Sequence, residues 1–179
     1  MFVLSAKAKY GLKALVRLAK EPPLRAVLGA DLAKQELIPR KFLEQILLEL
    51  KHRGLVQAKR GRHGGYQLTR SPAEITYGQI IRALDGPIAP IPCVSLTPYA
   101  SCDECRDEAT CGIRLVMKQV RDAMARILDT ATLADVVRMI AAASRTPEVL
   151  PVAPPVKARQ PVAAGQTVRF RELRGKPKR

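Results

Sequence analysis

Four cysteines lie close together in a chain of 179 residues. Cys93, Cys102, Cys105 and Cys111 fall within 19 consecutive residues, and the other 160 residues contain no cysteine. A metal ion or an iron-sulfur cluster needs several thiolates at one point, whereas thiols used for packing have no reason to cluster. We therefore interpret this segment as a candidate inorganic centre with a sensing role.

Three chemistries are open to these thiols at this stage. The first is an iron-sulfur cluster. The second is zinc, because Cys102 and Cys105 have a C-x2-C spacing that zinc accepts, although Cys93 and Cys111 do not form a second such pair. The third is a set of metal-free thiols. Acidic residues close to the thiols are expected to raise the thiol pKa values, and a bound cation would reverse this effect. These residues are Asp103, Glu104, Asp107 and Glu108.

The net charge of +15 is unevenly distributed along the chain. Residues 1–70 carry 15 Lys/Arg against 5 Asp/Glu, residues 71–145 carry 8 against 9, and residues 146–179 carry 8 against 2. A basic head and a basic tail favour a polyanionic partner, and they favour nucleic acid over a membrane because no long apolar span is present. A basic surface that serves only solubility is the alternative.

The periodicity of the first part of the chain predicts three helices and a hairpin. We expect helices over 6–20 and about 30–36, and a third that has Pro39 at its first helical position and ends at Gly54. Two extended runs, 55–60 and 66–69, are joined by a glycine-rich loop. This order predicts a mainly α fold with a winged helix-turn-helix domain and a β-hairpin wing, rather than a helical bundle with an incidental hairpin.

The rest of the chain predicts an appended helical part. A fourth helix is expected over about 76–84, and a long helix with an apolar stripe over about 113–128. The stripe indicates a dimerisation helix or a helix that packs back on its own head. Thr132 to Asp135 resembles a capping box for a last helix. The predicted organisation is a DNA-binding domain at 1–86, a cysteine loop at 87–112, a dimerisation part at 113–145 and a disordered basic tail at 146–179.

Several motifs together resemble one bacterial family. They are Leu43-Glu44-Gln45, the wing Arg60-Gly61-Arg62-His63-Gly64-Gly65-Tyr66, the run from Ile80 to Gly86, and Cys105-x5-Cys111. Over roughly residues 1–140 these resemble the IscR/NsrR type of regulator, the Rrf-two family. The resemblance implies a homodimeric transcription factor that binds a double-stranded DNA operator and holds a [2Fe-2S] or [4Fe-4S] cluster.

The resemblance also implies site residues. Three family-type ligands would be Cys93, Cys105 and Cys111. Some relatives add an acidic residue of the partner subunit, but Lys9 stands at that position here and cannot bind iron. We therefore expect Cys102 to supply the fourth thiolate, although a role as a spare or resolving thiol stays open.

By the same resemblance, the candidate DNA contacts lie on the third helix and the wing. Lys41, Gln45 and Arg60 match positions that contact DNA in the family. Gln can bond adenine bidentately and Arg can read guanine or a narrow minor groove, whereas Lys meets phosphate. Glu44 either tunes sequence choice or pairs with Lys41 or Lys51. Additional backbone contacts are expected from Arg40, Arg62 and His63.

Several functions are disfavoured. The chain has only two His, with no nucleophile–base pair or phosphate-binding loop, so no enzyme and no small-molecule substrate are expected. Lys7, Lys9 and Lys13 interrupt any secretory signal, which predicts a cytoplasmic protein in which disulfides are disfavoured. The sequence predicts a repressor that senses iron-sulfur, iron, redox or nitric oxide status. The alternatives are a zinc or metal-free regulator of sulfur or cysteine metabolism with a partner protein, and a non-specific nucleic-acid-binding protein.

Overall fold

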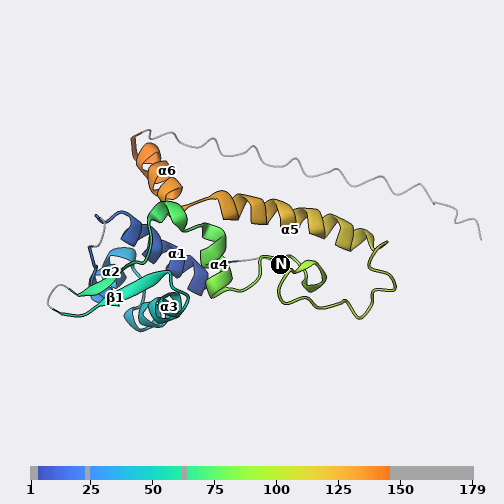
Figure 1. Cartoon of the computed structure of the whole chain (residues 1–179), viewed down its shortest axis with the longest axis horizontal. Coiled ribbons are helices and arrows are strands. Elements are labelled where there is room, and N and C mark those ends of the chain that lie inside the picture. Colours follow the sequence, from blue (N-terminus) through green and yellow to red (C-terminus); the bar gives the residue numbers. More distant parts are fainter. Residues whose placement is uncertain (1–3, 23–24, 62–63, 146–179) are drawn as a thin grey trace, which may run out of the picture. The chain divides into compact units, whose positions relative to one another are not determined.

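The chain is mainly helical, with one two-stranded antiparallel sheet in its described part (Figure 1). Contacts divide it into the units Met1–Pro147 and Glu148–Arg179. The tail expected at 146–179 falls outside the described residues, and so the prediction of a disordered basic segment is not addressed. The computed structural model describes residues 4–22, 25–61 and 64–145.

Three helices form the head: α1 (Ala6–Ala19), α2 (Gly29–Glu36) and α3 (Arg40–His52). The Ser5 hydroxyl accepts a hydrogen bond from the Ala8 N–H at 3.0 Å, which satisfies a free donor at the start of α1. Apolar side chains at three- and four-residue spacing turn inward from each helix and make a continuous core with α4. Its fully buried members include Leu15, Leu32, Leu43, Ile46, Leu47, Leu50, Ile80 and Ile81.

The start of α3 differs from the prediction by one residue. Pro39 is the N-cap and not the first helical residue, because its ψ of 123° is non-helical while its carbonyl already accepts the Leu43 N–H at 2.9 Å. Before it, Leu37 is left-handed, with a φ of 55°, and it makes the tight turn between α2 and α3. Gly54, with a φ of 70°, follows α3 as the predicted left-handed cap.

The predicted hairpin is present as β1 (Val56–Lys59) and β2 (Gly65–Leu68), with Val56 opposite Leu68. An additional pairing joins it to the segment after α1: the N–H of Val27 donates to the Tyr66 carbonyl at 2.9 Å, and the N–H of Tyr66 donates back at 2.8 Å. A Cβ on Gly65 would lie 2.3 Å from the Val27 carbonyl oxygen, so this approach requires glycine. The base of the wing is thereby fixed to the head.

After the hairpin, a short turn η1 (Pro72–Glu74) leads to α4 (Tyr77–Leu84). A capping box starts α4: the Thr76 hydroxyl accepts from the Gln79 N–H at 3.2 Å, and the Gln79 side chain accepts from the Thr76 N–H at 3.4 Å. The inward face is as predicted, with Ile80, Ile81 and Leu84 buried.

The remaining elements are η2 (Pro92–Val94), α5 (Gly112–Thr130) and α6 (Leu133–Arg145). The predicted capping box before α6 is present, because Thr132 and Asp135 exchange side-chain and backbone hydrogen bonds. Helix α6 packs against α1 and η1. No helix in the described part of the chain combines the length and apolar character needed to cross a bilayer.

Helix α5 packs on the head with part of its apolar stripe and leaves the rest of the stripe exposed. Met124 and Leu128 pack on the core of the head, but several apolar side chains on α5 stay exposed. Arg82 of α4 binds Asp129 of α5 with both terminal nitrogens, at 2.5 and 2.9 Å. The C-terminal end of α5 is thus attached to the head. The exposed side chains are Ile113, Leu115, Val116, Val120 and Ile127.

Candidate nucleic-acid interface and cysteine loop

The solvent-facing side of α3 collects the residues predicted to read DNA. Arg40, Lys41, Glu44 and Gln45 are all exposed, while Leu43 and its neighbours one turn apart are buried. At 100° per residue, positions 40, 41, 44 and 45 span a sector of about 140° on the helix. Because the opposite face of α3 is buried, these side chains face solvent together, and they include the predicted α3 contacts Arg40, Lys41 and Gln45.

Glu44 pairs within α3. Arg40 Nε donates to Glu44 Oε1 at 2.9 Å, one helical turn away, so the expected partners Lys41 and Lys51 were wrong. Within the part of the chain that the structure describes, the side chains of Lys41 and Gln45 make no hydrogen bond or ion pair. Their donors and acceptors are available to a ligand without breaking a contact.

Leu48 is a further residue of this face that was not predicted from the sequence. This side chain is 51% exposed although it lies in a helix whose other leucines are buried. It stands three residues after Gln45 and four after Glu44, on the same face. The signal was available in that spacing, since an apolar side chain on this face can contact a thymine methyl group.

The wing, which follows α3 in the sequence, also carries exposed basic side chains. Lys59 ends β1, Arg60 follows it, and both are exposed. Gly61 has a φ of 105°, which supports the turn at the tip. The other two predicted wing contacts, Arg62 and His63, lie outside the described residues.

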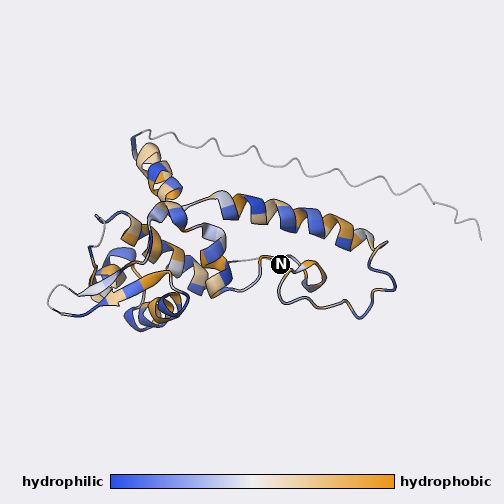
Figure 2. Ribbon diagram, viewed as in Figure 1, coloured by the Kyte–Doolittle hydropathy of each residue, from blue (hydrophilic) through white to orange (hydrophobic). Residues whose placement is uncertain are grey.

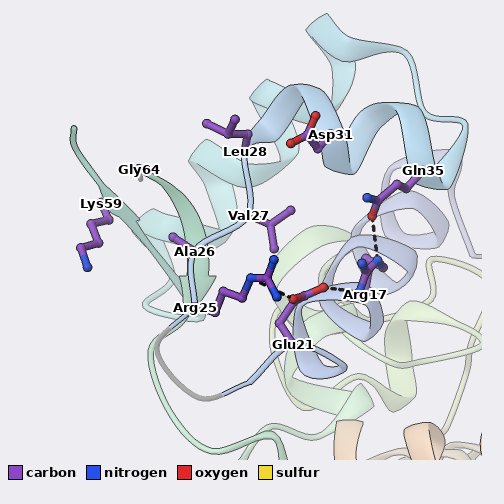
Figure 3. A pocket seen from close by; sticks show the side chains of 10 residues that line it. All are labelled: Arg17, Glu21, Arg25, Ala26, Val27, Leu28, Asp31, Gln35, Lys59 and Gly64. Carbon is purple, nitrogen blue, oxygen red and sulfur yellow. Dashed lines mark hydrogen bonds and ion pairs between the residues drawn. The ribbon is translucent and has the colours of Figure 1, made fainter. Parts of the chain in front are cut away.

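A concavity of about 400 Å³ lies between the end of α1, the start of α2 and the wing (Figure 3). Glu21 accepts from Arg17 at 2.5 Å and from Arg25 at 3.5 Å, and Arg17 Nε donates to Gln35 at 2.7 Å. One carboxylate is thus shared by two guanidinium groups and neutralises their charge in part. The cluster therefore braces the segment that pairs with the wing and is a weak candidate for a ligand site.

The cysteine loop brings two of its four thiols together. Cys105 and Cys111 are half-buried, and each thiol affects the pKa of the other. Cys102 is exposed, and Cys93 is buried in η2 with 8% of its surface accessible. The four thiols do not meet at one point.

The two paired thiols have pKa values displaced in opposite directions. Desolvation is the main cause that raises the pKa of Cys105, followed by the neighbouring Cys111 thiol. The backbone N–H of Arg114 at the start of α5 is the main cause that lowers the pKa of Cys111. The expected general rise caused by acidic neighbours was therefore wrong for Cys111, because free N–H groups at a helix start stabilise a thiolate.

The donor chemistry of the loop fits an iron-sulfur cluster or zinc, since four soft thiols are what either group uses. The geometry is not assembled: among residues 4–22, 25–61 and 64–145, no three His, Cys, Asp or Glu side chains are grouped closely enough to hold a metal ion. The segment from Leu96 to Cys111 contains no helix or strand. Gathering the four thiols would therefore require this segment to move.

Comparisons with known proteins agree with this architecture. The family model described as Rrf2, iron-dependent transcriptional regulator, matches residues 4–139. The rrf2-like HTH-type transcriptional regulator of Rhodobacter capsulatus is 40% identical over 151 residues, which cover 83% of this chain and 99% of that protein.

Two solved structures are similar over most of the chain. CymR, the global cysteine regulator of B. subtilis, has a TM-score of 0.65 and 32% identity, covering 78% of this chain and 98% of that chain. IscR of T. potens has a TM-score of 0.61 and 28% identity, covering 78% and 88%. The predicted winged-helix fold is confirmed, and the relatives are regulators rather than enzymes, as predicted. This chain belongs to the Rrf2 family of helix-turn-helix transcriptional regulators.

Proposed function

We propose that the chain is a cytoplasmic homodimeric repressor that binds a DNA operator and senses iron-sulfur, iron, redox or nitric oxide status through its cysteine loop. The observation that carries the DNA-binding part is the exposed face of α3 beside a basic wing, held by a buried core. A face with free Lys41 and Gln45 side chains can dock in a major groove without first losing contacts.

The roles on DNA follow from side-chain chemistry. Gln45 can bond an adenine edge through its amide, and Arg60 can enter the minor groove or bond guanine. Lys41 is assigned to phosphate, where a point charge contributes affinity without sequence preference. Arg40, Arg62 and His63 are assigned to the DNA backbone. Because Glu44 holds Arg40 at 2.9 Å, Arg40 would have to exchange this partner for phosphate.

Helix α5 supports the proposed homodimer. Figure 2 shows apolar stretches interleaved with polar ones along this helix. Ile113, Val116, Val120 and Ile127 stay between 38% and 70% exposed in the single chain, although their three- and four-residue spacing gives one stripe. A second copy of the stripe would bury them, and two heads would then match two half-sites about 34–36 Å apart.

The sensing part of the proposal is supported by the donor set. Cys93, Cys102, Cys105 and Cys111 supply the four thiolates that an iron-sulfur cluster takes. Such a group, when bound, supplies a centre that responds to oxidants, nitric oxide and iron supply. The protein side of the mechanism is the movement of the 96–111 segment, which leads directly into α5.

Anaerobic purification tests this proposal. The protein is expected to be brown, with visible absorption and stoichiometric iron and sulfide, and a variant with all four cysteines changed to serine is expected to be colourless. Mössbauer spectroscopy would then give the cluster type. Colourless, iron-poor wild-type protein from oxygen-free cells would contradict the cluster.

A second candidate is a zinc or metal-free regulator that acts with a partner protein in sulfur or cysteine metabolism. The similarity to CymR favours it, because that protein is named as a cysteine regulator. It predicts colourless protein, with either one zinc ion per chain or four freely titratable thiols.

A non-specific nucleic-acid-binding protein is the third candidate, and competition binding separates it from both regulators. A regulator should prefer its own promoter over bulk DNA by about 10³ or more at moderate salt.

A further inference from the structure

Arg121 of α5 is a buried cation: its residue surface is only 8% accessible. One terminal nitrogen donates to the Val94 carbonyl oxygen at 2.9 Å, and Nε donates to Asp122 Oδ1 at 2.8 Å. A buried guanidinium is costly unless its donors are used. Its location is therefore best explained by what it holds, which is the backbone of η2, 27 residues earlier in the chain.

Arg114 makes a second contact of the same kind. Its Nε donates to the Cys93 carbonyl oxygen at 3.3 Å, and it lies 3.4 Å from Glu108 Oε2. Glu108 in turn accepts from the Tyr99 hydroxyl. Positions 114 and 121 are seven residues apart, two turns along one face of the helix. Two consecutive carbonyls, those of Cys93 and Val94, are thus held by two arginines on one side of α5.

The four thiols consequently fall into two groups. Cys93 is buried in the turn that these arginines hold, while Cys102, Cys105 and Cys111 are exposed or half-buried on the following segment and at the start of α5. Hydrogen bonds from a charged donor are stronger than neutral ones. The arginine contacts thus hold the backbone of the turn in which the Cys93 thiol is buried.

We propose that Arg121, assisted by Arg114, is a positioning residue that fixes the Cys93 turn on α5 whether or not the thiols hold anything. Cys93 is then held on α5, as Cys111 is by its place at the start of that helix, and Cys102 and Cys105 move relative to them. The positioning role of Arg121 does not depend on the proposed sensing function. Only the use that the protein makes of this role rests on that proposed function. Any rearrangement of the loop would pull on α5 through the carbonyls of Cys93 and Val94, which gives the loop a direct mechanical link to the helix proposed to set the spacing of the two heads.

Thiol alkylation kinetics test the link on the full-length, reduced, metal-free protein, with each cysteine followed by mass spectrometry after iodoacetamide pulses. In the wild type, Cys93 should react more slowly than Cys102. Arg121→Met keeps most of the apolar stem but removes the donors, and it should raise the rate at Cys93 by at least about tenfold without changing Cys102, because a charge-assisted hydrogen bond is lost. Arg121→Lys, which keeps one charged donor, should recover part of the protection.

Arg126→Met provides the matched control, because Arg126 is an exposed arginine on the same helix with no side-chain partner in the described chain. It should leave all four rates unchanged. Equal protection of Cys93 in the wild type, Arg121→Met and Arg126→Met would overturn the proposal. An increase at all four cysteines together with a lower melting temperature would also overturn it, since it would show general unfolding. If only Cys93 responds while anaerobic protein is colourless, the positioning role stands and the cluster does not.

Discussion

The winged head and the cysteine loop differ in how firmly the chain positions their functional side chains. In the head, buried leucines and isoleucines fix the side chains of α3 and the wing before any partner arrives. In the loop, the thiols have no shared core beneath them, and no three of the described His, Cys, Asp or Glu side chains are grouped closely enough to hold a metal ion. The proposed DNA-binding surface is thus preformed, whereas the proposed sensing site would be completed by what it binds. A proposed DNA-contact surface that is already formed, joined to a proposed ligand site that forms only on binding, suits a protein that changes between two states.

Identical truncations should have very different effects in the two regions. Leu47→Ala removes a fully buried side chain of the head and should lower the free energy of unfolding by about 2–5 kcal/mol. Leu96→Ala removes a side chain that is 76% exposed in the loop and should change it by less than about 0.5 kcal/mol. Urea unfolding of metal-free protein gives both values, and similar losses would show that the loop has a packed core of its own.

The proposed DNA-contact surface can be divided further by two substitutions on α3. Gln45→Ala should cost about 1–3 kcal/mol at one base pair and relax the preference there. Lys41→Ala should weaken binding to all sequences alike and reduce the salt dependence by about one phosphate contact. Fluorescence anisotropy with the promoter and single-base variants, at several salt concentrations, measures both effects. Indistinguishable behaviour of the two variants would refute the contact assignment.

The attachment of α5 to the head should show a smaller effect that depends on pH. The hydrogen bond from Arg82 is the main cause that lowers the pKa of Asp129. Since the folded pKa is depressed, this stabilisation is present above the unfolded pKa and is lost as the pH falls through the folded one. Asp129→Asn should lower the free energy of unfolding by about 1 kcal/mol or less at pH 7, because both side chains are over a third exposed.

The same series needs an acid end point and a control. Near pH 2, the wild type and Asp129→Asn should converge. Asp103→Asn, an exposed carboxylate that makes no hydrogen bond or ion pair within the described chain, should track the wild type at every pH. A constant difference between the wild type and Asp129→Asn from pH 7 to pH 2 would mean that packing near Gly78, and not the ion pair, is responsible.

Local patterns were sufficient to predict the head. The spacing of apolar residues placed α3 and its exposed face correctly, and Gly54 marked its end, because helix period and capping are local properties. The pairing of Val27 with Tyr66 could not be predicted this way, since it joins residues 39 positions apart through backbone groups that every sequence has.

The loop was less accessible to the same reasoning. Its four thiols predicted the candidate ligands, but a list of ligands does not say which of them are in place. The lowered pKa of Cys111 depends on where α5 starts, since Cys111 is the N-cap of that helix. The contacts of Arg114 and Arg121 with backbone carbonyls could not be predicted from the sequence pattern. The DNA-contact roles, the cluster and the dimer stay predictions.

The claim that the loop controls the head is tested most directly by promoter affinity measured anaerobically in two states, reconstituted with iron and sulfide or metal-free. We predict a ratio of at least about tenfold between the two states for the wild type, as for a coupling free energy of the usual size. We predict a ratio of one for the variant in which Cys93, Cys102, Cys105 and Cys111 are serine. Equal affinities of the two wild-type states, or an unchanged ratio in the serine variant, would contradict the account.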